Sequence, residues 1–343
     1  MARQTPSITE VLDEYLQTRV HLSKNTLLND RSVLQGFVGT FRDIQIGHLT
    51  ARHVEAFFYG QQGICHRMNA ASYNKVIQRV AGFLRFAEAR GYNRQPLLAN
   101  VRPMRITKRE RLRLSPREML SLLDVTRDPR NRCMLALAMN TGLRAGEITG
   151  LRVGDVDLAN GDLLVHVSKS AVEDRMPITR ELDGELRRWL LAYQNEIGRP
   201  LRSDDHLFPA RYAPRLLQMR VEGDAPPTPG GGLRPDMPMT HPARVVQLAL
   251  RDIGLEIESG EGFHTLRRSA ARAFFDSMAD AGHDEALRMT SAFLHHSSTQ
   301  TTELYLGLQH ERLKRDAALR GESFLTALSH QGSVLPLRPR KEA

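Results

Sequence analysis

The sequence has few cysteines, no long apolar segment and very little lysine. Its 343 residues include 2 cysteines, Cys65 and Cys133, which are too few for a disulfide framework or a four-thiolate metal site. The longest uninterrupted apolar run, Cys133–Met139, is far shorter than the roughly 20 residues that cross a bilayer. The first residues, Met1–Pro6, contain no apolar signal-peptide core. These absences exclude membrane, secreted and zinc-finger classes, and we expect a cytoplasmic protein.

The positive charge is distributed unevenly. Residues 1–113 hold 18 basic and 8 acidic side chains, a net charge of +10, whereas residues 114–343 hold 30 and 31, a net charge of −1. This asymmetry is typical of a nucleic-acid-binding part joined to a part with another role. A basic face that only improves solubility would have the same composition, so charge alone leaves both explanations open.

Apolar residues recur at helical spacing through most of the chain. The spacing and the capping residues predict helices over 8–20, 23–38, 50–59, 70–89, 115–125, 129–140, 145–151, 182–197, 242–253, 264–279, 283–293, 298–306 and 309–328. Residues 162–167 and 175–178 read as short strands that flank the polar turn 168–174. The predicted fold class is therefore mainly α with a small β hairpin, an α+β arrangement in the second half.

Composition divides the chain into three parts. We expect a helical domain over 1–92, which the charge favours as the nucleic-acid-binding part, a basic linker over 93–113 and a second domain over 114–343. The linker should stay extended unless a polyanion lies beneath it, because its charges repel one another; an ordinary solvated linker is the alternative. Its basic residues are Arg94, Arg102, Arg105, Lys108, Arg109, Arg111 and Arg113. Residues 209–238 are rich in proline and glycine and are expected to form a flexible insertion.

Four short segments with polar and charged side chains stand out together. They are Thr141–Ile148, which contains Arg144 and Glu147; Lys169 in the polar turn; His264–Arg268; and Leu294–Ser298, followed by Tyr305. Taken singly, each has an ordinary explanation, since arginines after turns form ion pairs and histidines and tyrosines on helices are usually core residues. Lysine at 169 is informative because the chain has 42 arginines and only 6 lysines, and a lysine can donate a proton where an arginine cannot.

In this order and spacing the segments resemble the tyrosine recombinase, or phage integrase, family. That family has an arginine in a T-G-L-R-x-x-E turn, a lysine in a β hairpin, an H-x-x-R box and an L-G-H-S-like segment with a tyrosine nine residues beyond its histidine. The positions that match are Arg144, Lys169, His264, Arg267, His296 and Tyr305. The family's glycine is replaced here by His295, so either His295 or His296 could point into the site, and the nine-residue count favours His296.

The resemblance implies a reaction and a role for each residue. Tyr305 would attack a DNA phosphodiester to give a 3′-phosphotyrosine and a free 5′-hydroxyl, without ATP or another cofactor. Arg144 and Arg267 would clamp the phosphate oxygens, and Lys169 would be the general acid. His264 would transfer a proton, His296 would bind a phosphate oxygen and Glu147 would orient an arginine.

The resemblance also implies a layout and partners. The family places a helical core-binding domain before the catalytic domain, and the chain is expected to lack the additional arm-binding domain of many phage integrases. Four protomers would assemble on two double-stranded core sites, and residues 309–343 would dock on their own core or on a neighbouring protomer. Phage integration and excision, with a directionality factor, is the expected setting, while transposon movement and chromosome-dimer resolution remain open.

Three alternatives come from other classes. A DNA-binding or architectural protein could have the same fold without catalysis, although every active position is filled. A type IB topoisomerase-like enzyme would use related chemistry on a single duplex. A metal hydrolase would need ligands among His264, His283, His295 and His296, but the chain has no H-E-x-x-H motif and no convergent carboxylates, so no metal is expected.

Overall fold

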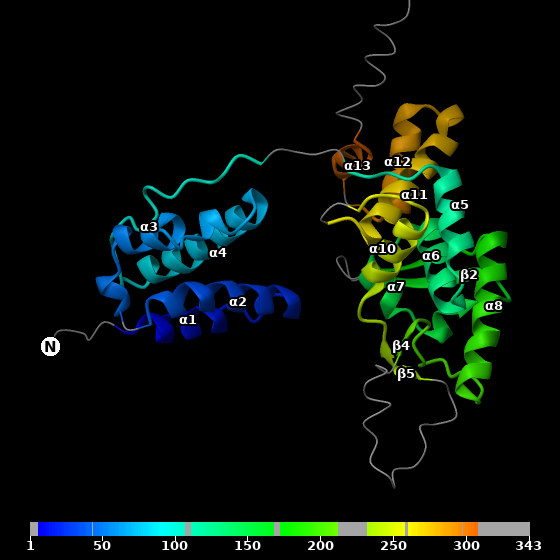
Figure 1. Cartoon of the computed structure of the whole chain (residues 1–343), viewed down its shortest axis with the longest axis horizontal. Coiled ribbons are helices and arrows are strands. Elements are labelled where there is room, and N and C mark those ends of the chain that lie inside the picture. The colour runs from blue at the N-terminus through cyan, green and yellow to red at the C-terminus, as the bar shows by residue number, and fades with distance from the viewer. Residues whose placement is uncertain are drawn as a thin grey trace, which may run out of the picture. The chain divides into compact units, whose positions relative to one another are not determined.

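The computed structural model describes residues 6–42, 44–106, 111–167, 172–211, 232–257, 260–296 and 298–307. The chain divides into two compact units, Met1–Glu110 and Arg111–Ala343. Each unit has an apolar core of its own, and the elements of both are labelled in Figure 1.

The regular elements of the first unit, within the part that the structure describes, are helices. Its helices are α1 (Ile8–Gln17), α2 (Lys24–Thr40), α3 (Ala51–Tyr59) and α4 (Ala70–Ala89), with 3-10 turns η1 (Ile46–His48) and η2 (Ile64–His66). Each α-helix begins where a side-chain oxygen accepts a hydrogen bond from a backbone N–H of the first turn. The residues that supply this oxygen are Ser7, Ser23, Thr50 and Asn69. These helices match the predicted ones, except that α1 ends before the exposed Val20.

Residues 93–106, the first part of the predicted basic linker, pack on the first unit. Leu97 and Val101 are buried in its core, and the buried Asn93 amide donates to the carbonyls of Ile46 and Leu49 at 2.7 and 2.8 Å. Charge repulsion therefore does not set the path of this segment, because burial of its apolar residues and these buried hydrogen bonds hold it in place. The two units meet in sequence between Glu110 and Arg111, and residues 107–110 lie outside the described part.

The second unit is a helical bundle with two small antiparallel sheets. Its helices are α5 (Pro116–Val125), α6 (Pro129–Thr141), α7 (Ala145–Gly150), α8 (Arg180–Ile197), α10 (Pro242–Asp252), α11 (Phe263–Ser277), α12 (His283–Phe293) and α13 (Thr299–Leu306), with 3-10 turns η3 (Val153–Asp155) and η4 (Ala279–Ala281). One sheet has the order β1 (Val156–Asp157), β2 (Asp162–Val167), β3 (Val172–Pro177). The α+β class predicted for this half is confirmed. The predicted helix 309–328 lies outside the described residues.

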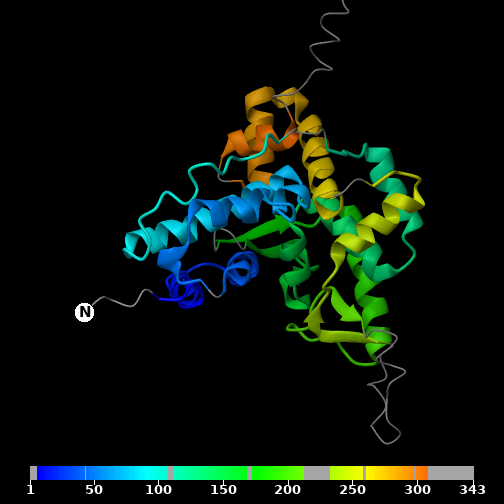
Figure 2. The ribbon, with the colours of Figure 1, turned by 60° about the vertical axis from the view of Figure 1, so that its left-hand side comes forward.

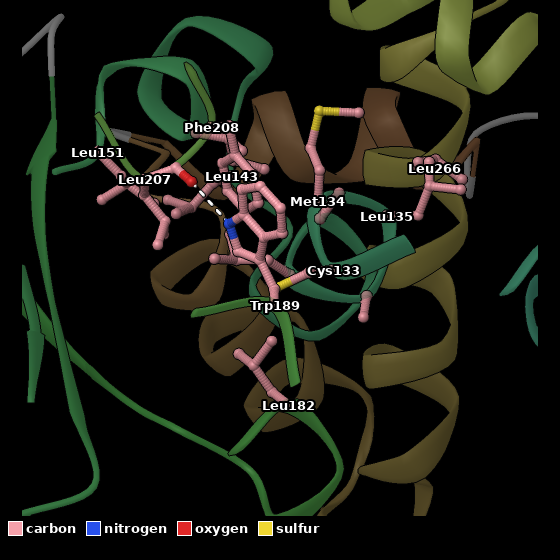
Figure 3. Close-up of a cluster of buried hydrophobic side chains, with 14 of the residues drawn as sticks. Cys133, Met134, Leu135, Leu143, Leu151, Leu182, Trp189, Leu207, Phe208 and Leu266 are labelled. Carbon is pink, nitrogen blue, oxygen red and sulfur yellow. Dashed lines mark hydrogen bonds between the residues drawn. The ribbon is translucent and has the colours of Figure 1, made fainter. Parts of the chain in front are cut away.

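Helix α6 occupies the centre of the second unit. Residues Cys133–Ala138 are almost completely buried, and α8 and α11 both pack against this helix. Figure 3 shows Trp189 of α8 in the core, where its indole N–H donates to the Leu207 carbonyl at 2.8 Å. A well-packed centre of this kind gives the helices that carry the site fixed positions.

Both ends of the predicted flexible insertion form short strands. Pro209–Arg211 forms β4 and Leu233–Pro238 forms β5, and the two strands pair antiparallel. Prolines are tolerated because a two-stranded sheet consists of edges, and the buried Leu233 anchors the pair on the core. The intervening residues 212–231 lie outside the described part.

The described residues include no helix that is both long enough and apolar enough to span a bilayer. Helices α11, α12 and α13 pack together at one end of the second unit, where Figures 1 and 2 show the orange α12 and α13 against the yellow α11. This grouping places the predicted catalytic segment His264–Arg268, on α11, beside Tyr305 on α13.

Candidate active site

Arg144 lies at the start of α7, where the chain leaves the Gly142 turn. Its backbone N–H and its Nη1 both donate to the Glu147 carboxylate, at 2.8 and 2.9 Å. Glu147 is 5% exposed, so this carboxylate is buried, and each of its oxygens accepts a hydrogen bond from Arg144. Glu147 therefore fixes the direction of the Arg144 guanidinium, as a buried bidentate acceptor does.

Gly142 makes the turn possible because its φ is +61°, a conformation that side chains rarely adopt. A Cβ at this position would lie 2.7 Å from Cε1 of Phe293 and 3.2 Å from Cδ2 of Leu294. The turn that presents Arg144 is thus packed directly against the end of α12.

We expect Gly142→Ala to lower the free energy of unfolding by about 2 kcal/mol, because it adds backbone strain and a steric overlap. Denaturant unfolding of the intact protein measures the change. Gly146→Ala is the matched control, since it sits in a helix and a Cβ added there would meet no heavy atom within 4 Å. Equal stability of the two variants would contradict this role of the turn.

Arg267 is buried at the centre of the site, with 2% of its surface exposed. From α11 its guanidinium donates to the carbonyl of Gly142 and, at 2.6 Å, to that of Leu294, and it lies 3.3 Å from Nε2 of His296. Burial, followed by the nearby Arg144, lowers the pKa of Arg267 to about 10. That value is still far above neutral pH, so the guanidinium keeps its charge. One side chain thus joins three of the predicted segments.

His296 and Tyr305 face the same guanidinium. Because Arg267 can only donate, Nε2 of His296 is the acceptor, and the imidazole proton is on Nδ1, 3.0 Å from the Thr302 hydroxyl. The rings of His296 and Tyr305 meet edge to face, with centroids 5.5 Å apart. The Arg267 guanidinium carbon lies 6.0 Å from the Tyr305 ring centroid. The tyrosine is therefore docked in the site of its own chain.

The hydroxyl of Tyr305 donates to the backbone carbonyl of His264 at 3.4 Å. His264 lies one helical turn before Arg267 on α11, and its side chain is exposed at the surface of the unit. The imidazole thus belongs to the residue of α11 whose backbone carbonyl accepts the hydrogen bond of the phenol.

Burial raises the pKa of Tyr305, while the charges of Arg267, Arg268 and Arg144 oppose that rise. The phenol therefore loses its proton above pH 10, the ordinary value for tyrosine. A raised pKa means that folding favours the neutral phenol, so this contribution to stability is full below pH 10 and is lost as pH rises toward the folded-state pKa.

This direction of shift predicts the alkaline titration of the DNA-free protein. The ultraviolet difference between wild type and Tyr305→Phe should show a phenolate that forms with a midpoint above pH 10. A midpoint below 10 would mean that the arginine field outweighs burial, and that the phenol is already activated without DNA.

The structure separates the two neighbouring histidines. His295 has a φ of +50°, and its Nε2 lies 2.8 Å from the carboxylate of Asp174 on β3. The next residue, His296, points instead to Arg267. Of the two alternatives, the geometry thus favours His296 as the residue that faces the predicted catalytic cluster.

The remaining predicted residues are distributed over both units. Lys169 lies outside the described residues, between β2 and β3. Of the basic residues, Arg94, Arg102 and Arg105 are exposed on the first unit, and Lys108 and Arg109 are not described. In the second unit Arg111 lies 3.8 Å from the Glu261 carboxylate, and Arg113 donates to the Leu306 carbonyl.

Two contributors were missed by the sequence reasoning. Arg268 pairs with the buried carboxylate of Glu261 and adds positive charge near Tyr305. Its position directly after Arg267 was the available signal. Thr302 is completely buried and holds His296, but no feature of the sequence distinguishes it from other threonines. Among the described residues, no group of three histidine, cysteine or acidic side chains could hold a metal ion.

Comparison with known proteins agrees with this site. The model of the phage integrase family matches residues 112–312. "Tyrosine recombinase XerC" of Pseudomonas fluorescens is 24% identical over 319 residues, covering 88% of this chain and 91% of that protein. "Tyrosine recombinase XerD" of Haemophilus ducreyi is 26% identical over 323 residues, covering 92% and 97%.

Solved structures share the fold. A lambda integrase dimer bound to a COC′ core site has a TM-score of 0.64 at 19% identity, covering 89% of this chain and 79% of that one. A lambda integrase tetramer bound to a Holliday junction has a TM-score of 0.64 at 18% identity, covering 88% and 78%. The chain belongs to the phage integrase family, the site-specific recombinases that act through a tyrosine.

Proposed function

We propose that the protein cuts and rejoins DNA strands at specific sites through a 3′-phosphotyrosine formed by Tyr305. One observation carries the proposal: the buried Arg267 is held between the Gly142 turn, His296 and Tyr305, with Arg144 close enough to lower its pKa. A phosphate that reaches the phenol would therefore meet guanidinium groups whose positions are already set.

The proposed reaction conserves a phosphodiester bond. The Tyr305 oxygen bonds to phosphorus while the bond from phosphorus to the 5′ oxygen breaks. The phenolic proton passes to His264, and the leaving oxygen takes a proton from Lys169. Attack by the 5′-hydroxyl of another strand reverses these steps and frees the tyrosine, so no nucleotide cofactor is needed.

The arginines stabilise the charge that builds up on the phosphate. Arg144 and Arg267 offer planar, permanently charged donors to the non-bridging oxygens, and Glu147 holds the first of them in place. His296 would donate a hydrogen bond to a phosphate oxygen after its Nε2, which accepts from Arg267 in the DNA-free protein, takes up a proton. The positions are fixed before substrate binds, which is how preorganised donors lower a barrier.

The proposed substrate is a pair of core-type DNA sites exchanged by four protomers. The lambda integrase structures with a similar fold include a tetramer on a Holliday junction. The setting we propose is phage integration and excision, with an accessory directionality factor, and the exposed Arg94, Arg102 and Arg105 would contact DNA phosphates. Xer recombinases are among the relatives, so chromosome-dimer resolution is the competing setting.

The test uses the full-length protein and a nicked suicide substrate carrying a candidate site from DNA beside its gene. Cleavage should trap a covalent protein–DNA adduct, with the 3′ phosphate attached to tyrosine. A binding or architectural protein would shift the DNA without forming an adduct, and that result would sink the proposal.

A second assay separates recombination from relaxation. Two intact duplexes that carry the site should yield recombinant products in which strands have been exchanged. Relaxation of supercoiled plasmid without exchange between duplexes would instead indicate a topoisomerase-like activity.

A further inference from the structure

Residues 111–114 run along α11 where the chain enters the second unit. The Leu114 N–H donates to the buried Ser269 hydroxyl at 2.8 Å, and Arg268 donates to the Leu112 carbonyl at 3.2 Å. Leu114 itself is 5% exposed, so this short segment is part of the packed structure. Its backbone is therefore fixed against the helix that carries His264 and Arg267.

From this fixed segment Arg113 reaches the end of the tyrosine helix. Its Nη1 donates to the backbone carbonyl of Leu306 at 2.7 Å. Leu306 is the last residue of α13 and is 1% exposed, and Gly307 follows with a φ of +68°. The last carbonyls of a helix have no partner within it, and a cation at that end also interacts favourably with the helix dipole.

The contact matters because Tyr305 directly precedes Leu306. Helix α13 has 8 residues, so its ends decide where the phenol lies. About one turn before Tyr305, Thr302 is hydrogen-bonded to His296, and after Tyr305 the guanidinium of Arg113 donates to the carbonyl of Leu306. The two contacts bracket the tyrosine on either side.

We propose that Arg113 is a positioning residue that holds the Tyr305 helix in the active site of its own chain. This inference rests on the proposed function of Tyr305. It assigns Arg113 a role different from the DNA contact expected from its place in a basic segment. If Arg113 holds the Leu306 carbonyl, its loss should lower the rate at which Tyr305 attacks DNA. If Arg113 contacts a phosphate, its loss should lower the affinity for DNA.

The first experiment measures single-turnover cleavage of the suicide substrate at saturating DNA. Arg113→Ala should lower the cleavage rate roughly tenfold, the size expected when a charged hydrogen bond to a partly buried carbonyl is lost. DNA affinity and its salt dependence should stay within twofold of wild type. Arg113→Lys should recover most of the rate, because an ammonium group can also donate to one carbonyl.

Arg117→Ala is the matched control, because Arg117 lies four residues after Arg113 and is exposed on α5. This variant should cleave DNA at the wild-type rate. If Arg113→Ala instead weakens DNA binding, flattens its salt dependence and leaves the saturated rate unchanged, Arg113 is a phosphate contact and the proposal is overturned. A folded Arg113→Lys no faster than Arg113→Ala would overturn it as well.

A second measurement does not depend on catalysis. In DNA-free Arg113→Ala the alkaline titration of Tyr305 should fall back toward pH 10, because a loosened helix exposes the phenol that burial now keeps neutral. Arg113→Met, which keeps an unbranched side chain but has no N–H or O–H donor, serves the same purpose if the alanine variant does not fold. An unchanged titration would overturn the inference. A wild-type protein that forms no adduct would refute the proposed function and leave this titration result standing.

Discussion

Replacing Tyr305 with phenylalanine should lower the yield of covalent protein–DNA adduct by roughly 10⁴-fold or more, to below detection. The substitution removes only the oxygen that would bond to phosphorus. The aromatic ring that packs edge to face on His296 is kept, and so is its place beside Arg267. DNA affinity should therefore stay within about twofold of wild type, because association depends mainly on phosphate contacts elsewhere.

Tyr193→Phe is the control for this experiment. Tyr193 is another buried tyrosine of the same unit, stacked on Trp189 with ring centroids 4.9 Å apart. The Tyr193→Phe variant should form the adduct at the wild-type rate. An adduct that persists in Tyr305→Phe would show that a different group attacks the DNA, and the proposed assignment of the nucleophile would be wrong.

Arg267→Lys is expected to lower the cleavage rate at least about 10²-fold, although it preserves the positive charge. An ammonium group cannot donate at once, in a plane, to the Gly142 carbonyl, the Leu294 carbonyl and a phosphate. The free energy of unfolding should also fall by about 2 kcal/mol, because a buried carbonyl that loses its donor is costly. Single-turnover cleavage and denaturant unfolding measure the two effects separately.

Arg272→Lys controls for the exchange of an arginine on the same helix. Arg272 is paired with Asp276 one turn further along α11, at 2.9 Å. Its replacement should change neither cleavage nor stability by a measurable amount, since exposed ion pairs contribute little. If Arg267→Lys cleaves within threefold of wild type, then charge alone is sufficient and the fixed geometry of the guanidinium is not what the reaction requires.

The sequence was a good guide to the helices. Capping residues such as Ser7 and Ser115 mark helix starts through local hydrogen bonds, which depend only on neighbours in the chain. The motif spacing anticipated that Arg144, Arg267, His296 and Tyr305 would gather at one place. Local hydrogen bonding and apolar periodicity are therefore sufficient to predict the helices. The matched motifs are what predicts that residues far apart in the sequence lie together.

Long-range packing accounts for what the sequence did not reveal. The charge of residues 93–106 suggested an extended linker, but burial of Leu97 and Val101 against distant helices prevails. The same is true of Arg113, which reads as one more basic residue until the fold places the Leu306 carbonyl within its reach. Partners that lie tens or hundreds of residues away leave no local pattern.

The contact between His295 and Asp174 has a consequence for how relatives of this protein are recognised. Glycine, which stands at the equivalent place in the family signature, accepts a left-handed backbone easily. Here a histidine takes up that backbone at φ +50°, and a carboxylate from β3 contributes to holding it. A search pattern that insists on glycine before the second histidine would pass over this chain. A pattern that requires a left-handed backbone at this position, and not glycine itself, would accept both glycine and histidine.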